Sequence, residues 1–488
     1  MIQNIDDTIY QKLNIKKEDL KIYNSSYNNV QNVEFLMVSI KDVKYIAVWG
    51  NGPIFDEFEG ELQKSGLKLC PLAHNNRLVL NKYVDHTNPK AFGKNITTFG
   101  VGDRLGLATP GHIRTISKSM AKPILAQQSK RELDFTGRTY RDVLDDVSFA
   151  VFQEGYKGDF GADGDHLKVE ADILDALHCG YTMITLDCSE KIGKGIDGLS
   201  PKEAASIYHN LPLALREHFE FKYLKNSFHI NGYPINFTKE ELIRNVLIYH
   251  EAISYITHIY KDYIVTAGRP IDFEISLDET ESITSAYGHL LVASEIIDAG
   301  VNITSLAPRF VGDFQKGIDY IGNHEDFEKH LKIHAAIADF YGYKISIHSG
   351  SDKFSLYHLI SLHTKGRLHI KTSGTSWLEA LGTIAQCNPS LYRKIHKCAL
   401  KHFEDAKKLY HVTTDLSNVL DIDTVDDQML QEYLKDNNSR QLLHITYGYI
   451  LQVPEIKTPF FETLHNYKQI YMHRLGQHIG NHLGLLGL

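Results

Sequence analysis

The feature that most constrains the fold is a repeated order of a short apolar strand, a polar cluster and an amphipathic stretch, which runs from about residue 96 to residue 415. The expected strands are Thr97–Val101, Pro123–Gln127, Thr182–Leu186, Ile271–Leu277, Ile303–Ala307, Lys344–His348, Leu368–Thr372 and Val412–Thr414. Helices are clearest at Tyr287–Ala299, His324–Tyr341 and Trp377–Tyr410. Eight β-then-α units predict an α/β protein with a closed (β/α)8 barrel of the TIM type.

The chain has 488 residues, more than such a barrel needs, so we expect an additional N-terminal unit. Residues 1–95 have the pattern of a small α/β extension, with β-prone apolar runs at Val33–Ile40 and Val43–Trp49. Helical spacing follows at Phe55–Ser65.

The catalytic barrel is expected to span residues 96–415, with inserted segments in two βα loops at 129–180 and 198–265. The second insertion has the pattern of two helices around a hairpin at 227–237. Residues 416–488 are expected to form a helical C-terminal extension packed on the barrel.

Composition excludes several classes of protein. The 60 acidic and 52 basic side chains are spread along the chain, so no basic patch indicates nucleic-acid binding. No window is apolar enough for a membrane span, and residues 1–10 lack the pattern of a secretory signal, which together predict a cytoplasmic protein. The five cysteines form no CxxC pair, whereas 26 histidines raise the chance of metal or acid–base chemistry.

Polar residues gather where the predicted strands end, and in barrel enzymes these ends form the active site. They include Gln127, Asp187, Asp278, Arg309, His348 and Lys371. Glu274 lies inside the fourth predicted strand, in phase with Asp278, so it should point into the barrel and needs a partner there.

The segment 161–168 (Gly-Ala-Asp-Gly-Asp-His-Leu-Lys) is the strongest local signal outside the predicted strands. Asp165 in it is equally well explained as the N-cap of a helix. His166 and His348 are candidate metal ligands, although a lone histidine is more often structural. Arg309 and Lys371 could recognise a carboxylate or pair with acids at the strand ends. The glycine-rich run at 99–106 does not match a dinucleotide fingerprint, so we expect no NAD.

Taken together, these residues make the sequence resemble the tagaturonate epimerase family of uronate-degrading bacteria. The resemblance rests on Phe99–His112, Gln127–Glu132, Gly161–Lys168, Thr185–Glu190, Phe273–Glu279, Ser305–Gly317, His348–Lys353 and His369–Thr375. It implies a metal-dependent barrel enzyme of hexuronate catabolism, which interconverts D-tagaturonate and D-fructuronate at C3.

The resemblance also implies roles for single residues. His166, His348 and Gln315 are the implied metal ligands, although chemistry favours Asp187 or Asp278 over Gln315 as the third ligand for a hard divalent ion. Asp165 and Glu274 are the implied acid–base pair. Substrate binding is expected from Gln127, Arg309 and Lys371. Mn, Co, Ni, Zn and Fe all suit such a mixed site, and the oligomeric state is left open.

Chemistry restricts the mechanism, because C3 is β to the ketone at C5 and its C–H bond is not acidic. Two routes remain: transient oxidation, and retro-aldol cleavage of the C3–C4 bond followed by re-addition. The missing NAD fingerprint weighs against oxidation, and retro-aldol cleavage would use a metal-stabilised enediolate as the electron sink. Two other enzyme classes fit the residues: a Schiff-base aldolase or epimerase using Lys371, and a metal-dependent ketose–aldose isomerase acting on sugar acids. A catalytically silent sugar-acid sensor is the alternative outside enzymes.

Overall fold

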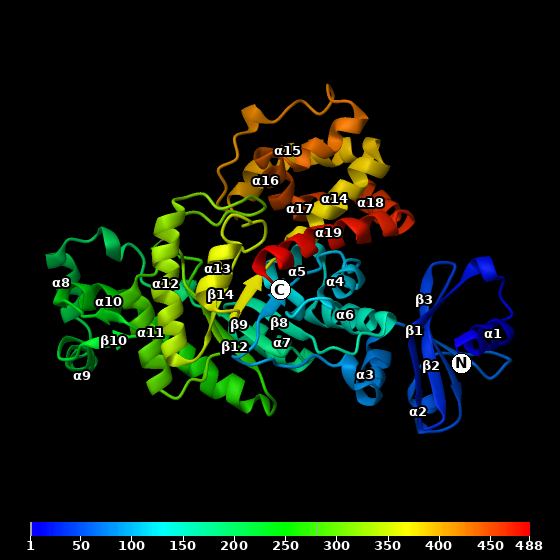
Figure 1. Ribbon diagram of the computed structural model, residues 1–488, viewed down its shortest axis with the longest axis horizontal. Coiled ribbons are helices and arrows are strands. Elements are labelled where there is room, and N and C mark those ends of the chain that lie inside the picture. The colour runs from blue at the N-terminus through cyan, green and yellow to red at the C-terminus, as the bar shows by residue number, and fades with distance from the viewer. Residues whose placement is uncertain (1, 281) are drawn as a thin grey trace.

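The computed structural model describes residues 2–280 and 282–488, and a closed barrel of eight parallel strands lies at its centre (Figure 1). Its strands are β6 (Thr98–Gly100), β7 (Lys122–Ser129), β8 (Gly161–Leu167), β9 (Met183–Asp187), β12 (Asp272–Ser276), β13 (Ser305–Ala307), β14 (Lys344–Ile347) and β15 (Leu368–Lys371). The predicted α/β fold of the TIM type is therefore confirmed. Apolar side chains of the strands face the surrounding helices in one continuous core, as in other parallel sheets that are covered on the outside.

One predicted strand is wrong and one barrel strand was missed. Residues 412–414 form no strand, because β15 pairs directly with β6 and closes the barrel before the chain reaches them. The missing strand is β8, whose polar, glycine-rich sequence lacks the β-branched and aromatic residues that mark strands. Segment 129–180 is therefore a regular part of the barrel, not an insertion; it holds α5 (Lys130–Thr136), α6 (Tyr140–Glu154), β8 and α7 (Glu170–Cys179).

The helices around the barrel follow the predicted pattern closely. They are α4 (Thr109–Ile116), α11 (Ala286–Asp298), α12 (His324–Tyr341) and α13 (Tyr357–Thr364), whereas α14 (Thr375–Cys387) and α15 (Pro389–Lys407), which follow β15, pack with the C-terminal helices. The predicted helix 377–410 is two helices, because Asn388 caps the second through its side chain and Pro389 starts it.

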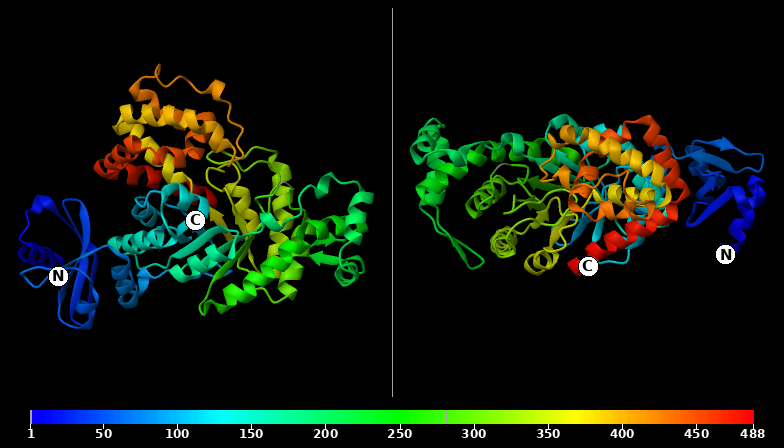
Figure 2. Two further views of the ribbon diagram at one scale, coloured as in Figure 1. Left: turned by 180° about the vertical axis from the view of Figure 1, so that it is seen from behind. Right: turned by 90° about the horizontal axis from the view of Figure 1, so that it is seen from above.

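The segment 198–265 extends from the barrel at one end of the molecule (Figures 1 and 2). It consists of α8 (Pro201–His209), α9 (Leu213–Phe219), a hairpin of β10 (Phe228–Ile230) and β11 (Tyr233–Ile235), and α10 (Lys239–Ile259). The predicted hairpin is thus present, and α10 packs against α11 of the barrel.

The N-terminal unit stands at the opposite end (Figures 1 and 2). Its antiparallel sheet has the order β1-β2-β3-β5-β4, with β1 (Leu20–Val30), β2 (Val33–Ile40), β3 (Val43–Gly50), β4 (Glu61–Leu62) and β5 (Lys68–Pro71). The helices are α1 (Ile2–Leu13), α2 (Pro53–Glu57) and α3 (His74–Tyr83). The helix predicted at 55–65 is confirmed only for residues 55–57, where α2 ends, because residues 61–62 form β4 instead. Gly60 permits the close approach to β5, since a Cβ there would lie 2.4 Å from the Leu69 carbonyl oxygen.

The C-terminal helices α16 (Asn437–Ile445), α17 (Tyr447–Leu451), α18 (Pro454–Asn466) and α19 (Lys468–Leu486) share a separate hydrophobic core with α14 and α15. Trp377 is buried at its centre and donates a hydrogen bond to the Leu443 carbonyl oxygen (2.8 Å). Helix α19 returns across α4 and α13 to the barrel. Among the described residues, no helix combines the length and apolar character needed to cross a membrane.

Candidate active site

The predicted inward orientation of Glu274 is seen in the barrel. Its side chain is fully buried, and the hydroxyls of Thr185 and Ser305, on the two neighbouring strands, donate to it at 3.2 and 2.5 Å. The register explains this arrangement, because Glu274 lies opposite both residues in the parallel pairing of β12 with β9 and β13. A buried carboxylate needs such donors to remain ionised.

An irregularity in β8 brings two consecutive side chains, Asp165 and His166, to one site. Neighbouring residues of a regular strand point to opposite faces. Here the pairing with β9 shifts between Gly164 and Leu167, and His166 has a positive φ of 53°. Both side chains consequently lie at the same site, and His166 Nδ1 is 2.8 Å from Asp165 Oδ1. Asp165 is therefore not a helix N-cap; α7 begins five residues later.

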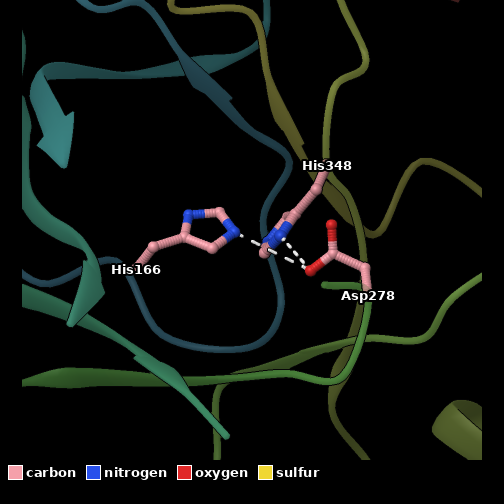
Figure 3. Close-up of side chains that lie close together, drawn as sticks. All are labelled: His166, Asp278 and His348. Carbon is pink, nitrogen blue, oxygen red and sulfur yellow. Dashed lines mark hydrogen bonds and ion pairs between the residues drawn. The ribbon is translucent and has the colours of Figure 1, made fainter. Parts of the chain in front are cut away.

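His348 follows β14 and lies between two carboxylates. Its Nε2 is 2.7 Å from Glu274 Oε1 and its Nδ1 is 2.8 Å from Asp278 Oδ1. The side chain of His166 reaches the same carboxylate, with Nε2 3.7 Å from Asp278 Oδ1 (Figure 3). His166, Asp278 and His348 thus offer one ligand atom each, all within 4.8 Å of one another.

These three residues fit a divalent cation. Ligand atoms about 2.0–2.2 Å from a metal lie roughly 3 Å apart, close to the separations seen here. Each histidine also has its other nitrogen on a carboxylate, Asp165 or Glu274, as metal-binding histidines usually do.

The electrostatics of the site favour a cation at the same place. Burial alone would lower the pKa of both histidines, but Asp165 raises that of His166 well above its usual value and Asp278 raises that of His348. Burial would likewise raise the pKa of Asp278, yet the positively charged His348 holds it well below the usual range. The carboxylates therefore favour positive charge at this place. Protons on the two imidazoles supply it here, and a divalent metal ion could take the place of these protons.

Lys371, at the end of β15, lies among three carboxylates. Its Nζ is 2.5 Å from Asp165, 3.0 Å from Asp163 and 3.1 Å from Glu274. Burial would lower the pKa of Lys371, but these carboxylates raise it well above its usual value. Lys371 is consequently a protonated ammonium that contacts Asp165 and Glu274 at the same time.

A cavity of ≈ 290 Å³ opens above this cluster. Its lining includes Arg131, His166, Asp278, Arg309, Lys316 and His348. The volume is near the lower end for small-molecule sites and suits a single sugar unit. Carboxylates, imidazoles and cations therefore converge on a pocket at the end of the barrel where catalysis is expected.

Comparison with known proteins decides the family. A family model described as tagaturonate epimerase matches residues 23–486. The chain belongs to the tagaturonate epimerase family. The resemblance inferred from the motifs is thus confirmed, and the chain is an isomerase of this family.

Two relatives cover nearly the whole chain. The tagaturonate/fructuronate epimerase of Thermotoga maritima is 40% identical over 471 residues, which is 96% of this chain and 97% of that protein. Crystal structures of the fructuronate-tagaturonate epimerase of Cohnella laeviribosi, native and with glycerol, are 48% identical, cover 99% of both chains and superpose with a TM-score of 0.95.

The other predicted metal ligands, Gln315 and Asp187, lie outside the cluster of His166, Asp278 and His348. The Gln315 amide oxygen accepts hydrogen bonds from Thr413 and Gln441 at 2.9 Å, so it faces the C-terminal helices and not the histidines. Asp187 lies 3.3 Å from Lys168 and outside the cluster of His166, Asp278 and His348. A role for Gln315 stays a prediction, and the geometry favours Asp278, the alternative that chemistry had also favoured.

The three predicted substrate-binding residues lie in different surroundings. Gln127 is fully buried below the cavity and donates to Asp163 (3.2 Å). Arg309 lines the cavity and donates to the Thr280 carbonyl oxygen. Lys371 is enclosed by carboxylates, as described above. Their contacts with substrate stay predictions, and Arg309 is the one with direct access.

Sequence reasoning missed a cation of this cavity, Lys316. Its Nζ donates to Ser349 Oγ (2.9 Å) and, among the described residues, has no carboxylate within ion-pair distance. Burial lowers its pKa. Lys316 lies in the loop after β13 and not at a strand end, so the search of strand ends could not find it. Arg131, stacked on Tyr410 with its guanidinium 4.8 Å from the ring centre, was missed for the same reason.

Proposed function

We propose that this chain interconverts D-tagaturonate and D-fructuronate by epimerisation at C3, with a divalent cation held by His166, His348 and Asp278. The arrangement of the two histidines is the main support. Each has one nitrogen on a candidate acid–base carboxylate and turns the other toward Asp278. The family and the names of its relatives supply the substrate pair.

Retro-aldol chemistry follows from the substrate. A base removes the proton of the C3 hydroxyl, the C3–C4 bond breaks, and C3 becomes an aldehyde while its electron pair moves to C4 and the C5 ketone. Rotation about C2–C3 presents the other aldehyde face, the C3–C4 bond re-forms, and the new C3 alkoxide is protonated. A divalent cation, when bound, acts as a Lewis acid for the negative charge that develops on the oxygens.

Asp165 and Glu274 suit the two proton transfers. The hydroxyl at C3 points one way before rotation and the other way afterwards, so one carboxylate is needed on each side. Burial would raise the pKa of both, but His166 and Lys371 hold that of Asp165, and Lys371 that of Glu274, well below the usual range. Each is therefore available as a base. The proton that one carboxylate takes from the C3 hydroxyl must reach the other before the new alkoxide is protonated, and the Lys371 ammonium, which contacts both, can pass it on by giving one proton and accepting the other.

Lys371 fits this scheme as a positioning residue. A Schiff-base route needs a neutral amine. Three carboxylates around its Nζ keep Lys371 charged, which argues against that route.

An isotope experiment distinguishes the retro-aldol route from proton abstraction at carbon. Tagaturonate carrying deuterium at C3 should give fructuronate that keeps all of it, because the C3–H bond never breaks. Mass spectrometry of the product measures this. Loss of the C3 label would overturn the route, and solvent deuterium in an aldose product would favour a ketose–aldose isomerase.

The substrate carboxylate must be held while the aldehyde rotates, and we propose Lys316 and Arg309 for this role. Lys316→Met and Arg309→Ala should each lower kcat/KM on tagaturonate about 10–100-fold, since a hydrogen bond to a charged group contributes roughly 1.5–3 kcal/mol. The neutral ketose tagatose, used as a substrate or competitive inhibitor, should be affected much less. Lys130→Met, an exposed neighbour of the cavity lining, is the control. Equal losses on the acid and the neutral sugar would refute the assignment.

A further inference from the structure

A second cavity lies where the N-terminal sheet meets α18 and the start of α19. Its volume is ≈ 690 Å³, and it shares no lining residue with the cavity of the active site. Lys21 on β1, Lys44 on β3 and Lys468 at the first position of α19 bring three ammonium groups to its lining. Segments more than 400 residues apart in the sequence therefore contribute cations to one space.

The three lysines lack anionic partners. Within residues 2–280 and 282–488, no hydrogen bond or ion pair involves Nζ of Lys21, Lys44 or Lys468, and Lys21 only lies over the ring of Tyr23 (5.0 Å).

Nearby carboxylates already have other partners. Asp42 lies 3.2 Å from His465, and Glu154 lies 2.8 Å from Arg114. Asp146, which lines the cavity, is paired with Arg138. Asp42 and Asp146, which both line the cavity, therefore make no ion pair with the three lysines, although Asp146 and Glu154 attract Lys44, and Glu154 and Asp42 attract Lys468, at longer range.

The charge of each lysine also makes the protonated form of its neighbours less favourable. Burial, and then the charge of Lys468, lowers the pKa of Lys44 to about 8. Burial, and then the charge of Lys21, lowers the pKa of Lys468. Like charges brought together in a partly dry space repel strongly, and an anion between them would relieve this repulsion.

We propose that this cavity binds a small dianion, either a phosphate group or a dicarboxylate, through Lys21, Lys44 and Lys468. The hydroxyls of Tyr23 and Ser39, also in the lining, are suitable hydrogen-bond donors to its oxygens. The volume leaves room for an organic part beyond the anionic group. The proposal does not depend on the catalytic mechanism.

Calorimetric titration with inorganic phosphate, and separately with malonate, tests the site and distinguishes the two sources of charge. Saturable binding of either is expected, with a Kd raised at least tenfold in Lys44→Met and in Lys468→Met. Lys401→Met, an exposed lysine on α15, should bind as the parent does. Lys316→Met separates the two cavities: any binding of the anion to the active site should weaken, whereas binding in the second cavity, which Lys316 does not line, should persist.

Two results would overturn the proposal: no saturable binding of either anion, or binding that Lys44→Met and Lys468→Met leave unchanged. Binding that is lost in Lys316→Met alone would place the anion in the active site and overturn it as well. If the variants misfold, chemical modification of the unaltered protein still tests the site. Acetylation of Lys44, followed by mass spectrometry, should slow at least fivefold when the binding anion is present, whereas Lys401 should react at the same rate; equal reactivity of Lys44 with and without anion would contradict the site.

Discussion

Replacing His348 with alanine is expected to abolish metal binding and to lower the rate of epimerisation about 1,000-fold, since a Lewis acid contributes several kcal/mol to stabilising the transition state. The change removes one candidate ligand and also the contact of its Nε2 with Glu274. Metal content by mass spectrometry and initial rates on tagaturonate measure the two effects. His473→Ala, an exposed histidine of α19, should bind metal and turn over substrate like the parent.

The same assay decides the third ligand. Asp278→Asn should lose metal as His348→Ala does, because Asp278 Oδ1 lies within reach of both histidines. Gln315→Leu should keep most of the metal, because its amide oxygen faces Thr413 and Gln441. The reverse result would restore Gln315 as the ligand and leave Asp278 as a hydrogen-bond partner of His348.

Asp165→Asn and Glu274→Gln should each lower kcat about 100–10,000-fold at saturating metal, because general acid–base catalysis contributes factors of this size. Saturating metal is necessary, since each carboxylate contacts one of the histidines and its loss should weaken metal affinity about 10–100-fold. Titration of activity with metal separates the two effects.

Asp187→Asn is the matched control for these variants. Asp187 is the last residue of β9, which lies between β8 and β12, but its carboxylate pairs with Lys168. A loss of less than tenfold is expected. If Asp165→Asn and Glu274→Gln recover the parental kcat once metal is saturating, the two carboxylates only support the histidines and another group moves the protons.

Periodicity in the sequence was sufficient to predict the barrel but not β8, the strand that carries Asp165 and His166. All expected strands except 412–414 are barrel strands, because their apolar residues face the helices as burial requires. β8 was missed because its positions are occupied by the carboxylates and imidazole of the site in place of strand-forming residues. Conflicts between local preference and fold are expected at functional sites.

The orientation of single side chains could be predicted only where a strand is regular. Alternation along β12 correctly placed Glu274 inside the barrel and Asp278 on the same side. No such rule predicts that Asp165 and His166 meet at one site, because this depends on the positive φ at His166. Contacts of Lys371 with the carboxylates of β8 and β12, and of Gln315 with the tail, depend on tertiary packing that one sequence does not encode locally.

The division of the chain into an N-terminal unit, a barrel and a tail at residues 95 and 415 stays a prediction, as does the cytoplasmic location. Helices α14 and α15, which precede residue 415, share the hydrophobic core of the tail. Truncation experiments should therefore treat residues 375–488 as one helical body.

The most direct test of a metal-dependent epimerase is the conversion of D-tagaturonate to D-fructuronate by the purified protein before EDTA treatment, after it, and after each divalent metal is added back. The account predicts conversion that disappears with the chelator and returns with at least one of Mn, Fe, Co, Ni and Zn. Conversion at the full rate in EDTA, by protein shown to contain no metal, would contradict it and make Lys371 the first residue to examine for a covalent intermediate.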